Sequence, residues 1–110
     1  MVGYMAHPIG EGEALVANVA RAKRWLRWLY RHYRGYVALA PYLLELEILS
    51  LDRDEGLERD ILVLRACDVL WLCGGHISPG MAVERHAAET MGKRIIDLTD
   101  LGPEPPDGGL

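Results

Sequence analysis

The stretch of sequence that decides the fold reads VLWLCGGHISPGMAVE and covers residues 69–84. Its first part, residues 69–73, is apolar without alternation, which is typical of a parallel β-strand covered on both faces. The pair Gly74-Gly75 ends that strand. Ser78 is a good helix N-cap and Pro79 a good first helical residue, because the N–H that proline lacks would have no helical partner there. The stretch therefore predicts a strand, a glycine-rich turn and the start of a helix.

Glu84 lies early in that helix, close to its N-terminus and to the carboxyl end of the strand. Open α/β sheets bind their ligands at the carboxyl ends of the strands. The free N–H groups and the dipole at the start of a helix favour an anion. The turn and the first part of this helix are therefore the first place to look for a functional site.

Apolar strand segments and helical segments alternate along the rest of the chain. Further strands are expected at Val2 to Ala6, Tyr36 to Ala40 and Arg94 to Leu98. Helices are expected at Glu11 to Tyr33, at Asp54 to Ala66 with Asp52 or Asp54 as the cap, and at Ser78 to Met91. Pro41 to Leu51 fits either a short helix or a packed loop. Right-handed crossovers place helices on both faces of a parallel sheet, so this order predicts a three-layer α/β fold with four to five strands.

The first helix shows the clearest periodicity. Its apolar stripe has spacings of three and four and consists of Leu15, Val19, Ala22, Leu26, Leu29 and Tyr33. Trp25 and Trp28 lie beside this stripe, where they either extend it or form a subunit contact. The helix also carries many arginines, which fit a solvated face better than a nucleic-acid surface.

The 110 residues, half of them hydrophobic, predict one domain with a modest core. We expect the domain to cover residues 1–100 and the proline- and glycine-rich tail, residues 101–110, to be flexible. A domain this small leaves apolar surface uncovered, which favours a homodimer or a larger homo-oligomer. The net charge of −4 gives no general case for binding nucleic acid.

The two cysteines, Cys67 and Cys73, flank the central strand too far apart to form a disulfide and are interpreted as buried thiols in a reducing compartment. No signal peptide or transmembrane run is present in the sequence given, so a cytoplasmic location without membrane association is expected. No set of histidines, cysteines and carboxylates has the spacing of metal ligands, and no cofactor is expected.

Three fragments of the chain carry a resemblance to a known group of proteins. They are Tyr4-Met5-Ala6-His7-Pro8 after the first strand, Asp60 ahead of Cys67-Asp68-Val69, and Ser78 to Glu84. Together they resemble the nucleoside 2-deoxyribosyltransferase-like superfamily, which includes the transferases and the 2′-deoxynucleoside 5′-monophosphate N-hydrolases. The resemblance extends from Val2 to about Leu98 and implies a flavodoxin-like or Rossmann-like fold.

The resemblance implies cleavage of an N-glycosidic bond by double displacement. Glu84 would attack the anomeric carbon and hold a covalent deoxyribosyl intermediate, as carboxylates do in retaining glycosidases. Asp60 matches the position near the base and would be the general acid that helps the base leave. The group's substrate-binding positions correspond here to Tyr4, Ala6, His7, Pro8, Ile9, Gly10, Ser78, Gly80 and Ala82.

Ser78 bears on the choice between the two branches. The transferases carry an acid at the matching position, which would repel a 5′-phosphate, whereas the monophosphate hydrolases carry a phosphate-binding serine. Serine at a helix N-terminus favours a nucleotide substrate. The chain also departs from both patterns, since Pro8 and Gly10 stand where the hydrolases have a serine and an arginine. The transferases supply an asparagine near the C-terminus, whereas Asn18 is the only asparagine in this chain.

Other interpretations remain open at this point. Taken alone, Glu84 fits an ordinary surface glutamate, and Asp60 a solvated helix residue or the partner of an arginine. Gly74-Gly75 ahead of Glu84 also resembles the phosphoribohydrolases, which would act on ribonucleotides. A non-catalytic nucleotide-binding module is the remaining alternative, and the missing phosphate contacts support it.

Overall fold

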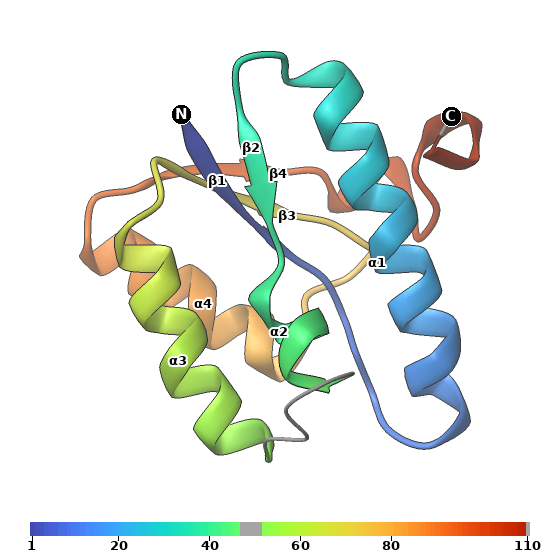
Figure 1. The fold of residues 1–110 in the computed structure, drawn as a ribbon, viewed down its shortest axis with the longest axis horizontal. Helices are drawn as coiled ribbons and strands as arrows, with labels where there is room; N and C mark the ends of the chain where they lie inside the picture. The colour runs from blue at the N-terminus through green and yellow to red at the C-terminus, as the bar shows by residue number, and fades with distance from the viewer. Residues whose placement is uncertain (47–51, 110) are drawn as a thin grey trace.

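Four parallel strands form the centre of the protein in a computed structural model that describes residues 1–46 and 52–109 (Figure 1). They are β1 (Val2–Ala6), β2 (Val37–Leu39), β3 (Val69–Leu72) and β4 (Arg94–Asp97), in the sheet order β2-β1-β3-β4. All four residues of β3 are buried, as its unbroken apolar sequence predicts. The register pairs Tyr4 with Leu70 and Ala6 with Leu72.

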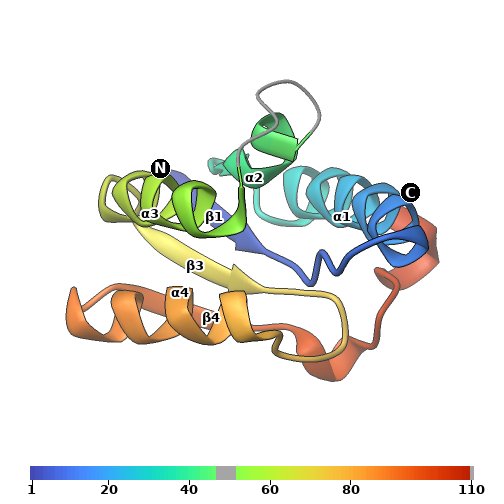
Figure 2. The same ribbon diagram turned by 90° about the horizontal axis from the view of Figure 1, so that it is seen from below.

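The helices cover both faces of this sheet. They are α1 (Glu13–His32), α2 (Pro41–Leu44), α3 (Arg53–Arg65) and α4 (Pro79–Thr90), with short 3₁₀ turns at Thr99–Leu101 and Pro106–Gly109. Figure 2 shows α3 and α4 together on one side and α1 with the C-terminal segment on the other. The predicted three-layer, parallel α/β fold, flavodoxin-like or Rossmann-like, is therefore confirmed.

Local sequence explains where the helices begin. The Asp52 side chain accepts a hydrogen bond from the Glu55 N–H at 2.9 Å and so caps α3. Ser78 caps α4, with Pro79 in its first turn. Of the segment Pro41 to Leu51, the first part forms α2, and residues 47–51 lie outside the described residues.

Large aromatic rings fill the layer between the sheet and α1. Trp25 and Trp28 are buried and pack edge to face with ring centroids 5.6 Å apart, so they extend the apolar stripe into the core. The indole of Trp71 lies over Gly3, where an added Cβ would sit 2.2 Å from the Trp71 ring. Glycine on β1 therefore makes room for the tryptophan on β3.

Cys67 and Cys73 are buried free thiols, as predicted. The C-terminal segment, for which proline and glycine content predicts flexibility, lies against α1 in the structure (Figure 1). The backbone of Gly109 approaches the Arg24 carbonyl so closely that a Cβ would lie 2.6 Å from its oxygen. Proline and glycine allow this close, turned path, and composition alone does not distinguish such a path from a flexible tail.

Candidate active site

Three buried polar side chains from three elements meet beneath the carboxyl edge of the sheet. They are Tyr4 on β1, Asp60 on α3 and Glu84 on α4, which are 0 %, 1 % and 5 % exposed. Both carboxylates raise the pKa of the Tyr4 phenol through their charge, which requires all three groups to lie near one another. The fold therefore brings together residues that are 80 positions apart in the sequence, and neither acid is an ordinary surface residue.

The environment of Tyr4 is electrostatically distinctive. Burial is the largest cause of its raised pKa, followed by the negative charge of Glu84 and then that of Asp60. Both causes disfavour the phenolate, so this phenol keeps its proton well above the usual tyrosine pKa. A protonated phenol beside two acids can donate a hydrogen bond to a carboxylate or to a ligand.

Tyr42 completes the buried cluster from α2. Its ring lies 6.2 Å from the ring of Tyr4, and its hydroxyl donates a hydrogen bond of 2.7 Å to the Met5 carbonyl oxygen. This hydrogen bond fixes α2 against β1 beside the site. Tyr42 carries no signal in the sequence, because the segment around it fits either a helix or a loop.

A cavity of about 370 Å³ opens at the start of α4, and neither of the two acids is among its lining residues. Its lining residues come from the first loop, α3 and the start of α4, and they are Ile9, Gly10, Glu11, Asp54, Leu57, Ser78, Pro79, Gly80 and Val83. Leu57 is one turn ahead of Asp60, and Gly80 is one turn ahead of Glu84, so each acid shares a helix face with a lining residue. Each acid therefore lies one helical turn beyond a lining residue of the cavity, towards the C-terminal end of its helix.

The first loop contributes to this site in two ways. Ile9 and Gly10 line the cavity, whereas His7 and Pro8 are buried beneath the Gly74-Gly75 turn, where a Cβ on Gly74 would lie 2.6 Å from the Pro8 ring. His7 is 4 % exposed, and its Nδ1 lies 2.6 Å from the Pro8 carbonyl oxygen. Its pKa is lowered to about 4, mainly because burial penalises the charged ring. Ala6 is fully buried at the end of β1.

The start of α4 forms the opposite wall. The Ser78 hydroxyl accepts a hydrogen bond from the Met81 N–H at 3.3 Å, so this side chain caps the helix while it lines the cavity. Gly80 also lines the cavity, whereas Ala82 is exposed and is not among the lining residues. Of the substrate-binding positions that the resemblance implies, Ser78 and Gly80 therefore line the cavity and Ala82 does not.

Acidic residues at the rim were not foreseen. Among the lining residues that the structure describes, Glu11 and Asp54 are the charged ones, and both are exposed. The sequence signal was available, because each lies in the first turn of a helix or just before one, next to the carboxyl edge of the sheet. Their charges act against the pull of the α4 N-terminus on a ligand phosphate.

Within residues 1–46 and 52–109, no group of three or more histidines, cysteines and acids could hold a metal ion. None of the helices in those ranges is both long and apolar enough to span a membrane.

One family profile, described as "Domain of unknown function (DUF7768)", matches residues 3–98. No curated protein sequence matches the chain. Among solved structures, the chain is similar to one titled "2-desoxiribosyltransferase from Leishmania mexicana", with a TM-score of 0.62 and 20 % sequence identity. The match covers 87 % of this chain and 62 % of that one, so this chain spans less than two thirds of that protein. At this identity, the similarity shows a shared fold.

Proposed function

The chain belongs to the family described as "Domain of unknown function (DUF7768)", and for it we propose cleavage of the N-glycosidic bond of 2′-deoxynucleosides or their 5′-monophosphates. The observation that carries the proposal is the buried meeting of Tyr4, Asp60 and Glu84, with both acids one helical turn from residues that line a cavity. The shared fold with a protein titled as a deoxyribosyltransferase is consistent with it.

The first step of the proposed reaction forms a covalent intermediate. A carboxylate oxygen of Glu84 attacks the anomeric carbon, and the bond between that carbon and the base nitrogen breaks. Because positive charge develops on the sugar, a carboxylate beside it both stabilises the transition state and captures the sugar. The electron pair of the broken bond leaves with the base, and Asp60 in its protonated form delivers a proton to the base.

The second step releases the sugar from Glu84. Water or a second base attacks the anomeric carbon, gives its proton to the Asp60 carboxylate, and displaces the Glu84 carboxylate. Water yields the free deoxysugar, whereas a second base yields an exchanged nucleoside. Tyr4 is placed to hold the Glu84 carboxylate in position during both steps, because its phenol stays protonated.

The cavity has room for part of a nucleoside, one helical turn from the two acids. A volume of about 370 Å³ lies within the usual range of small-ligand sites. Gly10 and Gly80 line it without side chains, which leaves space close to the backbone. No cofactor is needed for this reaction, since both proton transfer and covalent capture use carboxylates of the chain.

The direct test measures release of free base from 2′-deoxynucleosides and their 5′-monophosphates by chromatography. We expect release by the native chain and a loss of at least about a thousandfold in kcat for Glu84→Gln, as for removal of other nucleophiles. Adding a second free base separates transfer from hydrolysis, because transfer yields an exchanged nucleoside.

The matched control is Glu89→Gln on the same helix. Glu89 is exposed and forms an ion pair with Arg85 at 3.3 Å, away from the cavity lining. Undiminished base release from Glu84→Gln would rule out the mechanism. Ribonucleotide cleavage in place of deoxynucleotide cleavage would assign the site to a phosphoribohydrolase instead, and tight binding without turnover would assign it to a binding module.

A further inference from the structure

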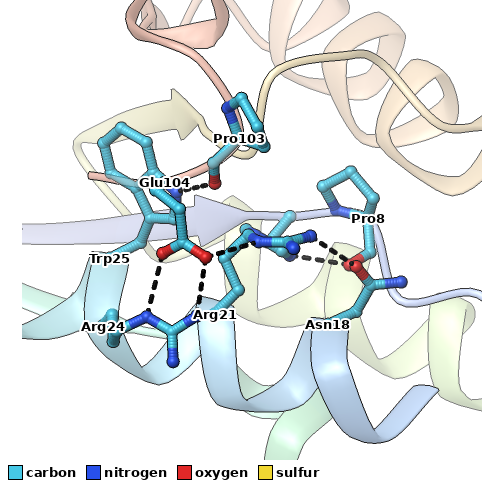
Figure 3. A network of polar contacts seen from close by, with 8 residues as sticks. Pro8, Asn18, Arg21, Arg24, Trp25, Pro103 and Glu104 are labelled. Atoms are coloured by element: carbon cyan, nitrogen blue, oxygen red, sulfur yellow. Dashed lines mark hydrogen bonds and ion pairs between the residues drawn. The ribbon is translucent and has the colours of Figure 1, made fainter. Parts of the chain in front are cut away.

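The C-terminal segment is tied to α1 by a set of polar contacts that the proposed reaction does not use (Figure 3). The Glu104 carboxylate accepts hydrogen bonds from Arg21 Nε at 3.1 Å and from Arg24 Nε and Nη2 at 2.9 and 2.7 Å. The Trp25 indole N–H donates to the Pro103 carbonyl oxygen at 2.9 Å. Trp25 is fully buried, so the segment supplies the acceptor for a buried donor.

These contacts continue from the segment to the first loop. Arg21 Nη1 donates to Asn18 Oδ1 at 3.1 Å, and Asn18 Nδ2 donates to the Ile9 carbonyl oxygen at 2.8 Å. Ile9 is itself a lining residue of the cavity. An unbroken series of side-chain hydrogen bonds therefore joins Glu104 to one wall of the cavity.

The same segment also packs on the loop that leads to the other wall. A Cβ on Gly75 would lie 2.8 Å from the Pro103 nitrogen, so the two backbones are in contact. Gly75 leads directly to Ser78, which lines the cavity, and its neighbour Gly74 packs on His7 and Pro8 of the first loop. The segment thus contacts the Gly74-Gly75 turn directly and is linked to the first loop through Arg21 and Asn18.

We propose that residues 102–109 act as a strap that positions the two cavity walls, with Glu104 and Arg21 as its positioning residues. Glu104 fixes the end of Arg21, Arg21 orients Asn18, and Asn18 holds the Ile9 carbonyl at the cavity. The role of the strap in substrate binding rests on the proposed function, whereas its effect on the loops does not. Exposed ion pairs add little to global stability, so the expected effect is local order.

The first experiment measures amide hydrogen exchange of the full chain by mass spectrometry, without ligand. Glu104→Gln removes the negative charge at nearly constant size and should speed exchange in peptides covering residues 9–15 by about threefold or more. Arg21→Gln cuts the link to Asn18 while leaving Arg24 on Glu104, and should affect the same peptides. Both variants should melt close to the native temperature.

Glu89→Gln is the control, since it breaks an exposed arginine–glutamate ion pair that lies within α4 and does not involve the strap. A salt series adds a second readout. Because high salt screens exposed charges, the native loop should exchange faster as salt rises, while that of Glu104→Gln should respond little. Unchanged loop exchange in both Glu104→Gln and Arg21→Gln would overturn the proposal, whatever their activity.

The second experiment connects the strap to the substrate. If the native chain releases base, Glu104→Gln should raise KM several-fold more than it lowers kcat, because the strap does not touch the reacting atoms. A several-fold loss in kcat with an unchanged KM would contradict a positioning role. If the native chain releases no base while loop exchange responds as expected, the proposed function fails and the strap stands.

Discussion

The Tyr4 phenol on β1 faces the Glu84 carboxylate on α4 in the interior of the protein. The charge of Glu84 raises the pKa of this phenol, second only to burial. Tyr4 acts on Glu84 in return, because a phenol that keeps its proton remains a hydrogen-bond donor for the carboxylate. Tyr4 and Glu84 therefore form one unit, in which the strand residue orients the helix residue.

Replacing Tyr4 with phenylalanine should slow base release without unfolding the protein. The ring would still fill its buried place, while the hydroxyl that orients Glu84 would be lost. A hydrogen bond to a charged group contributes about 1.5–3 kcal/mol, so we expect kcat to fall about 10- to 100-fold. Steady-state kinetics measures this effect.

The control for that prediction is Tyr30→Phe, because Tyr30 is a half-exposed tyrosine on α1. The pH profile offers a further check. Since the Tyr4 pKa lies well above 10, deprotonation of Tyr4 should cause no loss of activity in the native chain near pH 10. An equal kcat for Tyr4→Phe and the native chain would show that the phenol does not assist Glu84.

Asp60→Asn should impair cleavage most for substrates whose base leaves poorly. An amide cannot give a proton to the departing nitrogen, so natural deoxynucleosides should lose about 100-fold or more in kcat. A 7-methylated purine deoxynucleoside carries a positively charged base that leaves without protonation. Its cleavage should be reduced far less, and parallel assays of the two substrates measure the difference.

Equal losses for both substrates would contradict the role of Asp60 as general acid. Glu55→Gln on the same helix is a suitable control, because Glu55 is exposed and lines neither this cavity nor the neighbouring one. That variant should cleave both substrates at the native rate.

The fold could be predicted largely from the sequence, because local signals and the global pattern agree. The apolar run in residues 69–73 and the Ser78-Pro79 helix start fixed β3 and α4 to within a residue or two. Trp25 shows where periodicity was insufficient. The stripe of residues spaced three and four apart excludes Trp25, although its indole lies in the core, so the buried face of α1 is wider than the stripe.

The site could be predicted only in part. The resemblance identified Glu84 and Asp60, but sequence spacing alone cannot show that both are buried beside Tyr4. The contact between Glu104 and Arg21 is also beyond sequence reasoning, because it joins positions 83 apart through an exposed tail. Such contacts depend on the path of the C-terminal backbone in space, and the proline and glycine content of that segment does not determine its path.

The rim acids should set the preference between a nucleoside and its 5′-monophosphate. Glu11 and Asp54 repel a phosphate group, so Glu11→Gln and Asp54→Asn should each raise kcat/KM for the monophosphate by a few-fold relative to the nucleoside. The change should shrink at high salt, because exposed charges are screened. Competition assays with the two substrates measure the ratio. Glu89→Gln is the control and should leave the ratio at its native value. The native ratio in both Glu11→Gln and Asp54→Asn as well would show that neither acid faces the 5′ group.

His7 should make the protein less stable as the pH falls from about 6.5 to about 4. In the folded state, burial lowers its pKa to about 4, whereas in the unfolded chain the pKa is near 6.5. Above pH 6.5, both states carry neutral His7 and no stability is lost. Between these values the unfolded chain binds a proton that the folded chain does not, so stability falls by up to about 3 kcal/mol.

Chemical denaturation at several pH values measures this loss, and His7→Gln should show a flatter dependence because the amide does not titrate. Arg21, His76 and Glu104 also face His7. Of these, Glu104 has its pKa lowered from 4.5 to about 2, so its stabilising contribution is lost only as the pH falls between these two values. His86→Gln, at an exposed histidine on α4, should keep the native dependence. A His7→Gln curve as steep as the native one between pH 6.5 and 4.5 would mean that His7 accepts its proton in the folded state at its ordinary pKa.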